Sequence, residues 1–340
     1  MDKKLLTAIL ALIAATGCLN DLAYTPRDTE PMLVMNSLMT AGDASHEVWL
    51  GLSRPGTVDT LKGAASVRYS INGSAYAAAV EQEGRQRLRR FVFAGPLSPG
   101  DRVRLEAASG SYGASAEVTV PSLPVLGDID TLSVGDSAAR QLAFRIRMTD
   151  KTPGADYYSL GIICNSQIEF FKTGASVGTA EFSRLCPLDT GEDLVLSEEN
   201  IAAANMDSMF DIGTPNRFGA FFDSQFDCAS VVLKPKVNKW ELRSWYVETF
   251  LDYDSVYVKP VLRVDLSHID VRHYYYLKAL NSLESGTSDL VLEEIAIPDN
   301  VDGGIGFVGI SNTVSRELPL EPYGRPARYY EDESDELPGT

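Results

Sequence analysis

Alternation of apolar with other side chains is the feature that most limits the fold of this chain. Valine or leucine occupies every second position of 48–52, and Val67, Tyr69 and Ile71 repeat that spacing. A period of two places one set of side chains on one face of a β-strand, whereas a helix has a period of about 3.6. Asn72-Gly73 then supplies two residues that tolerate a positive φ, as a tight hairpin turn requires. The first third of the chain therefore predicts antiparallel strands joined by short turns.

Two domains are expected after the N-terminal region. Residues 31–122 carry strand and turn signals without a helical period, which favours an immunoglobulin- or fibronectin-like β-sandwich. The stretch 121–124 begins and ends with proline, which cannot continue a sheet, so it marks the boundary. Residues 123–320 predict a larger β-rich C-terminal domain.

One or two helices are expected in that second domain. Residues 256–266 predict a long strand, after which Ser267 is expected to cap a helix over 268–285. Ser197, followed by two glutamates, predicts a second helix running to about residue 209. Strands dominate elsewhere, so the predicted fold class is mainly β to α+β.

The N-terminus is typical of an export signal. Two lysines precede an apolar run over 5–15, which is shorter than the roughly 20 residues that span a bilayer. Small residues then lead directly to Cys18, which resembles the bacterial lipobox, where the thiol is acylated and cleavage makes the cysteine the new N-terminus. We expect a signal peptide over 1–17, a lipid on Cys18, and a tether over 18–30. The alternative is an ordinary secretory signal with an incidental cysteine.

The charge of the chain limits its partners. The formal net charge is −17, and no basic cluster offsets it, so a nucleic acid is not an expected partner. Residues 321–340 include an acidic run and predict a disordered tail. The lipid on Cys18 is the expected membrane attachment.

The remaining cysteines and the histidines do not form a metal-binding pattern. Cys164, Cys186 and Cys228 would lie where disulfides form, and the loop-like surroundings of the last two favour a Cys186–Cys228 bridge. The three histidines are scattered, and His268 and His273 are five residues apart, not four. We therefore predict no metal site.

Two glycine motifs match enzyme signatures by spacing. Gly304, Gly306 and Gly309 fit GxGxxG, but they lie in a β-like run without a following helix, which favours close backbone contacts over a dinucleotide site. Residues 174–178 match the GxSxG elbow around Ser176. A triad would require an acid, Asp223 or Asp252, and a base, His268 or His273. No helix signal follows Ser176, so a small-residue loop is the favoured interpretation.

Two acidic pairs contain the ligand type that Ca²⁺ prefers. Asp252 and Asp254 flank a tyrosine, and Asp299 and Asp302 precede two glycines. Neither pair completes a calcium-binding loop, and solvated turns explain both.

The order of several segments resembles a known family. PMLVMNSLMT at 31–40 follows the lipobox, and PGDRVRLEAASGSYGASAEVTVPSLP closes the first domain. ADYYSLGI, HYYYLKALNSL and DNVDGGIGFVGISN then occur in that order. This arrangement resembles the Bacteroidetes lipoprotein family known as domain of unknown function 4249. The resemblance implies an outer-membrane or cell-surface lipoprotein with an immunoglobulin-like first domain, often encoded beside a TonB-dependent receptor. It implies no catalytic residues, and segment 172–245 matches it least.

These observations lead to one functional hypothesis and two alternatives. The first is a non-enzymatic lipoprotein, anchored through Cys18 at the cell-surface or periplasmic face of the outer membrane, without a cofactor. It would serve as an accessory or ligand-capturing partner of a TonB-dependent receptor in nutrient uptake. The alternatives are an extracytoplasmic serine hydrolase that uses Ser176, and a structural or adhesive surface protein.

Overall fold

The computed structural model describes residues 30–54, 57–59, 61, 63–78, 80–83, 88–134, 141–197, 216–223, 226, 228–238, 253–284 and 297–326. In chain order its elements are β1 (Leu33–Thr40), β2 (Ser45–Arg54), β3 (Thr57–Asp59), β4 (Ala65–Ile71), β5 (Ser74–Tyr76), β6 (Val80–Glu83), β7 (Arg89–Ala94), β8 (Arg102–Ser109), β9 (Tyr112–Thr119), β10 (Val125–Val134), β11 (Gln141–Thr149), β12 (Tyr157–Lys172), β13 (Ala175–Leu185), β14 (Leu188–Asp189), β15 (Ala220–Phe222), β16 (Ser230–Leu233), β17 (Lys236–Asn238), β18 (Ser255–Ile269), α4 (Val271–Glu284), β19 (Val308–Pro319) and β20 (Tyr323–Pro326).

The first sandwich packs two sheets against each other. One layer is formed by β1, β2, β3, β6 and β7, which are part of an 11-stranded sheet that continues through β19 into the second sandwich. The other layer is a four-stranded sheet with the order β5-β4-β8-β9. Alternate side chains of each sheet turn inward, so that Val48 and Leu50 from β2 share one core with Val103 and Leu105 from β8. Burying each of these apolar side chains stabilises the fold by roughly 1.5–3 kcal/mol.

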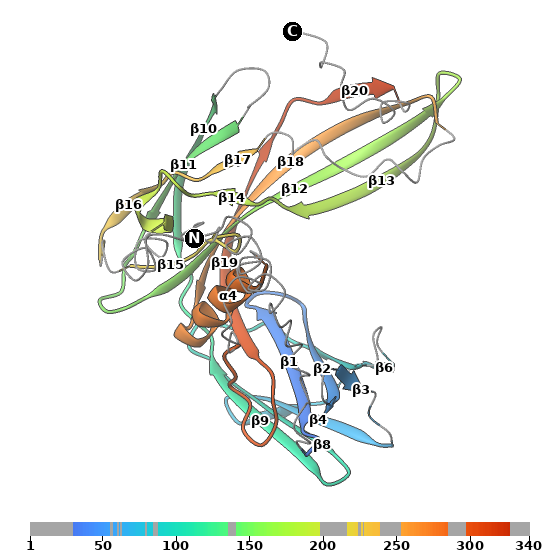
Figure 1. The fold of residues 1–340 in the computed structure, drawn as a ribbon, viewed down its shortest axis with the longest axis vertical. Coiled ribbons are helices and arrows are strands. Elements are labelled where there is room, and N and C mark those ends of the chain that lie inside the picture. The colour runs from blue at the N-terminus through green and yellow to red at the C-terminus, as the bar shows by residue number, and fades with distance from the viewer. Residues whose placement is uncertain are drawn as a thin grey trace, which may run out of the picture.

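The second sandwich is built on the long pair β12 and β18. These strands are antiparallel from Tyr157 opposite Ile269 to Phe171 opposite Ser255. A five-stranded sheet with the order β10-β11-β17-β14, with β16 beside β11, faces them. Leu160 and Ile162 of β12 meet Phe144 of β11 in the shared core. In Figure 1 this sandwich occupies the upper half of the molecule.

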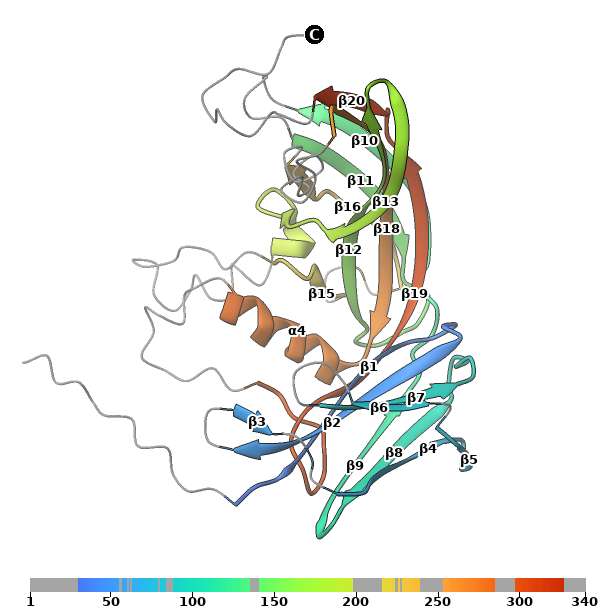
Figure 2. The same ribbon diagram turned by 90° about the vertical axis from the view of Figure 1, so that its right-hand side faces the viewer.

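One strand belongs to both sandwiches. β19 is antiparallel to β18 through residues 311–319 and parallel to β1 through residues 308–311. Val301, Val308 and Ile310 are buried in the core of the first sandwich. Residues 301–310 therefore complete a core that begins at residue 33, and Figure 2 shows β19 descending from the second sandwich to lie beside β1.

The fold class predicted from the sequence is confirmed. The described residues are mostly β-strand with few helical residues, and the Asn72-Gly73 hairpin has the expected positive φ values of 51° and 83°. The domain limits at 31–122 and 123–320 stay a prediction. The structure shows in addition that residues 301–310, which fall within the predicted second domain, pack into the core of the first sandwich.

Both helix starts differ from the prediction. Asp270, not Ser267, caps α4, because its Oδ1 accepts the N–H groups of Arg272 and His273 at 2.7 and 3.0 Å. Ser267 lies inside β18, where its hydroxyl bonds Thr313. Residues 194–197 are already helical, since Asp193 caps that turn; its continuation beyond residue 197 lies outside the described residues.

One part of the predicted disordered tail is a strand. Residues 323–326 form β20, which pairs with β18 between Ser255 and Val258. β19 covers β18 only from Val261 onward, so β20 supplies backbone partners to the part of that edge that would otherwise lack them. The signal segment 1–17, Cys18, the tether up to residue 29 and the tail beyond residue 326 lie outside the described residues. Within the described ranges, no helix has both the length and the apolar character needed to cross a bilayer.

Candidate functional site

Three aspartates converge at the base of the second sandwich. Asp150 follows β11, Asp156 precedes β12, and Asp223 follows β15. β15 pairs with the start of β12, which brings Asp223 beside Asp156. One carboxylate oxygen of each residue lies within 4.8 Å of those of the other two. Asp150 and Asp223 are only 2% and 1% exposed, while Asp156 is partly exposed.

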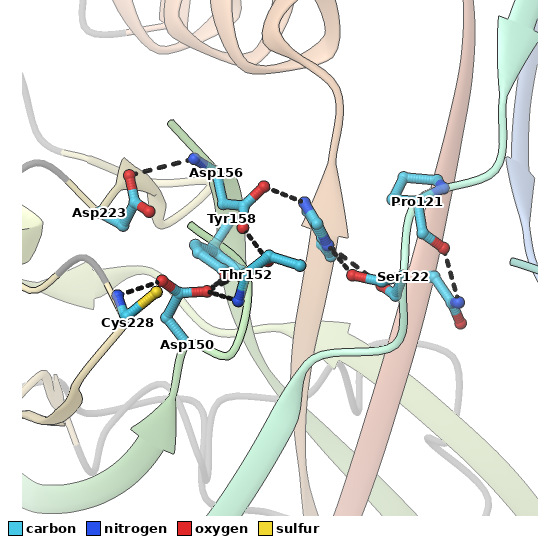
Figure 3. Close-up of polar contacts among 10 residues, drawn as sticks. Pro121, Ser122, Asp150, Thr152, Asp156, Tyr158, Asp223 and Cys228 are labelled. Carbon is cyan, nitrogen blue, oxygen red and sulfur yellow. Dashed lines mark hydrogen bonds and ion pairs between the residues drawn. The ribbon is translucent and has the colours of Figure 1, made fainter. Parts of the chain in front are cut away.

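Asp150 is held by hydrogen bonds from four donors. Its Oδ1 accepts from the Tyr158 hydroxyl at 3.0 Å and from the N–H and hydroxyl of Thr152, and its Oδ2 accepts from the Cys228 N–H at 2.7 Å (Figure 3). Burial alone would raise the pKa of Asp150, but these bonds outweigh it and hold the pKa below its ordinary value. Burial and the Asp150 charge raise the pKa of Tyr158, which keeps that hydroxyl a donor. Asp150 is therefore ionised and fixed in place.

Asp223 has a different environment. Its Oδ1 accepts the Asp156 N–H at 3.1 Å, but its buried Oδ2 has no hydrogen-bond partner in the described part of the chain. Burial raises the pKa of Asp223, and the charges of Asp150 and Asp156 raise it further. At 4.8 Å and an effective dielectric constant of about 20, two ionised carboxylates repel each other by about 3 kcal/mol. The cluster therefore concentrates negative charge where little water reaches it.

His268 connects the cluster to the link between the two sandwiches. Its Nε2 lies 3.3 Å from Asp156 Oδ1, and its Nδ1 lies 2.9 Å from the hydroxyl oxygen and 3.1 Å from the carbonyl oxygen of Ser122. Ser122 lies between β9 and β10, and Asn312 donates to the carbonyl of the preceding Pro121 at 2.9 Å. Figure 3 shows this path from Asp223 across to Pro121. The carboxylate cluster is thus coupled to the segment that joins the sandwiches.

The described residues do not bring the hydrolase candidates Ser176, Asp223 and His268 together. Thr173 and Gly174 form a hairpin turn with positive φ, and Ser176 lies in the exposed strand β13, not at the start of a helix. Ser176 pairs with Phe171, whereas His268 pairs with Tyr158 on the same strand β12. Thirteen residues of strand separate these positions, which is about 40 Å. Asp223, beside the start of β12, is equally remote, so this triad cannot assemble.

The interpretation of the GxGxxG glycines is confirmed. A Cβ on Gly304 would lie 2.5 Å from the Leu33 carbonyl oxygen, and one on Gly306 would lie 2.3 Å from the Met35 carbonyl oxygen. Gly306 also has a φ of +127°. Gly304 and Gly306 allow the segment before β19 to approach β1, and Gly309 lies within the parallel pairing, opposite Leu38.

The predicted cysteine bridge is absent from the structure. Cys186 is fully buried in the second core, whereas Cys228 is exposed in a turn with a φ of +54°. Both are thiols, as is the buried Cys164. The sequence prediction failed because Cys186, although it precedes a proline, continues the backbone pairing of the sheet through its bond to the Ile162 carbonyl.

The acidic pairs considered from the sequence have backbone roles. Asp254 Oδ2 accepts the Thr173 N–H at 2.5 Å and closes the β12–β13 hairpin. Asp299 accepts the N–H groups of Val301 and Gly306 at 2.7 and 3.3 Å. Asp302 forms a backbone bridge with Ser115, and Asp252 lies outside the described residues. The turn interpretation therefore fits the three that are described.

The cluster at Asp150, Asp156 and Asp223 was not predicted as a site. The sequence showed an acidic residue at each end of the 150–156 turn, and Asp223 entered only as the acid of a triad. Asp223 is 67 residues beyond Asp156, so their proximity depends on the pairing of β15 with β12. No local spacing indicates that pairing.

Comparisons with known proteins give a family but no function. No curated protein matches. Among solved structures, a DUF4785 family protein from Legionella pneumophila has 10% identity and a TM-score of 0.21, with 68% of this chain and 51% of that chain covered. The Yersinia pseudotuberculosis adhesin InvE has 11% identity and a TM-score of 0.19, with 68% and 54% covered.

The chain thus spans about half the length of each of these two proteins. At such TM-scores neither likeness indicates a shared fold or function. The family match is extensive, since it covers residues 20–317 and hence both sandwiches. The chain belongs to the family described as Domain of unknown function (DUF4249).

Proposed function

We propose that this protein is a lipoprotein of the outer membrane, anchored through Cys18, of the kind that the Bacteroidetes resemblance implies. It captures a ligand for, or otherwise assists, a TonB-dependent receptor in nutrient uptake, and it does so without catalysis. The observation that carries the proposal is the N-terminal pattern, in which a basic start, a short apolar run and small residues lead directly to Cys18. The receptor partnership follows from the family resemblance.

The position of the anchor supports a membrane-proximal first sandwich. Eleven residues lie between Cys18 and Glu30, and these twelve Cα–Cα steps reach at most about 40 Å. β1 begins directly afterward, so the lipid would hold the first sandwich within that distance of the bilayer. The second sandwich is coupled to the first through β19 and the Ser122 contact, and the two would act as one unit.

The arrangement of the described residues supports a non-catalytic role. Ser176 lies about 40 Å from His268 by the strand spacing of β12. His46 and His273 are buried, at 2% and 7% exposure, and the Nδ1 of each has no hydrogen-bond partner within the described ranges. These histidines belong to packed interiors and not to an open site.

Lipidation is tested by labelling cells with an alkyne fatty acid. The wild-type protein should carry the label and fractionate with the outer membrane. Cys18→Ser should lose both properties, while Cys228→Ser, which changes an exposed cysteine, should keep them. A labelled Cys18→Ser variant would contradict the anchor.

The receptor partnership is tested by gentle detergent extraction of the native outer membrane, with an affinity tag after Thr340. Stoichiometric recovery of a large β-barrel protein is the expected result. Recovery of the lipoprotein alone, from membranes in which the barrel is abundant, would contradict the partnership. If the protein then also binds to other cells without a receptor, that result would favour adhesion. A fluorophosphonate probe should leave Ser176 unmodified, and labelling that Ser176→Ala abolishes would favour the hydrolase.

A further inference from the structure

A buried carboxylate oxygen in the second sandwich lacks the partner that its position requires. Asp223 is 1% exposed, and its Oδ2 accepts no hydrogen bond from the described residues, although its Oδ1 is satisfied by the Asp156 N–H. Buried polar atoms are almost always satisfied by protein, water or an ion. Asp223 also belongs to the cluster in which one carboxylate oxygen of each aspartate lies within 4.8 Å of one oxygen of Asp150 and of Asp156. A ligand that accepts electron pairs from oxygen would satisfy the buried Oδ2.

The charges around that oxygen favour a cation. Three carboxylates meet there, and within the described ranges no lysine or arginine forms a salt bridge with any of them. Among the described residues, His268 is the basic side chain that contacts the cluster, and it contacts Asp156 from the side of Ser122. Hydrogen bonds to Asp150 favour its ionised form, so they do not remove the negative charge.

We propose that Asp150, Asp156 and Asp223 form a binding site for a divalent cation of the calcium class. All three residues offer oxygen ligands, which Ca²⁺ prefers, whereas Zn²⁺ sites are usually built with cysteine or histidine. The side chain of Asp156 is 19% exposed, so the cation has a path from solvent and water molecules complete its coordination.

The bound cation would join segments that are distant in sequence. It would link the 150–156 turn to Asp223, which directly follows β15. Asp156 also contacts His268, which contacts Ser122 in the link between the sandwiches. Binding would therefore stabilise both the second sandwich and its connection to the first, whichever partner the protein has.

The test uses the full processed protein in detergent, titrated with Ca²⁺. Ca²⁺ at about ten times its dissociation constant should raise Tm by about 3–6 °C. Tb³⁺, which replaces Ca²⁺ at oxygen sites, should show luminescence on tyrosine excitation, because the Tyr158 hydroxyl is bonded to Asp150. Added Ca²⁺ should displace Tb³⁺ and quench that signal.

Asp223→Asn is the decisive variant. The substitution removes a charge but keeps the size of the side chain. The variant should therefore bind Ca²⁺ at least tenfold more weakly than wild type, while its Tm without metal should equal or exceed that of wild type. Asp156→Asn, at a more exposed position, is the second variant should Asp223→Asn fail to fold. Asp302→Asn, which changes an exposed aspartate on the first sandwich, should respond to Ca²⁺ as wild type does.

Two results would overturn the proposal. One is a wild-type protein whose Tm and Tb³⁺ signal do not respond to Ca²⁺ at about 10 mM, well above the weakest sites of extracellular modules. The other is an Asp223→Asn variant with unchanged affinity. In either case a proton or a water molecule satisfies Asp223. Both results are independent of lipidation and of receptor recovery.

Discussion

Replacement of Ile310 by alanine tests whether the start of β19 holds the first sandwich together. Ile310 is fully buried in the first core and pairs with Met39 on β1. Truncation of a buried isoleucine to alanine costs about 2–5 kcal/mol, through lost apolar burial and the cavity left behind. Because β19 is paired with β1 at one end and with β18 at the other, the backbone around Ile310 has little freedom to move into the cavity. We expect a loss of about 3 kcal/mol.

That loss should be visible both globally and locally. A destabilisation of about 3 kcal/mol corresponds to a decrease in Tm of roughly 6–12 °C for a unit of 150–250 residues. Hydrogen exchange followed by mass spectrometry should show faster exchange in β1 and β9, more than 190 residues before the substitution in the chain. The exchange of β12, in the second sandwich, should change less.

Leu262→Ala is the matched control. Leu262 is also fully buried, but it lies in the core of the second sandwich. Its truncation should accelerate exchange in β12 and β18 more than in β1. If Ile310→Ala accelerates exchange only in the second sandwich, or costs less than about 1 kcal/mol, the reasoning that β19 completes the first core is refuted.

Three further predictions each probe a single physical effect. Gly306→Ala should lower the free energy of unfolding in urea by more than about 2 kcal/mol, because the φ of residue 306 is +127° and an added Cβ would meet a backbone oxygen. Gly178 has open space around it, so the control Gly178→Ala should change that free energy by less than about 0.5 kcal/mol. Burial lowers the pKa of His46 from its ordinary value of 6.5, so the unfolded chain binds the proton more readily than the folded protein does. As pH falls below 6.5, wild type should therefore lose stability relative to His46→Gln, with a slope of at most about 1.4 kcal/mol per pH unit. Equal pH profiles of the two proteins would contradict this. Asn216→Ala should cost about 3 kcal/mol, because the buried amide bonds both backbone groups of Ala220, and a cost below about 1 kcal/mol would show that water replaces it.

Local pattern was sufficient for the kind of secondary structure. The period of two at 67–71 and the Asn72-Gly73 turn are properties of adjacent residues, and the structure contains the strand and the hairpin they predict. The helix expected over 268–285 exists, although β18 continues to Ile269 and Asp270 caps the helix instead of Ser267. The error arose because a serine in a strand and a serine at a cap look alike until the backbone pairing is known.

The class of fold and the backbone use of the glycines at 304–309 were determined by the sequence itself, because alternation and the absence of a Cβ act locally. Only the tertiary structure decided that residues 301–310 complete the first core and that Asp223 meets Asp150 and Asp156. The pairing of β19 with β1, and of β15 with β12, joins segments separated by long stretches of chain. Such pairing is selected by the packing of whole sheets, and no short window of sequence contains both partners.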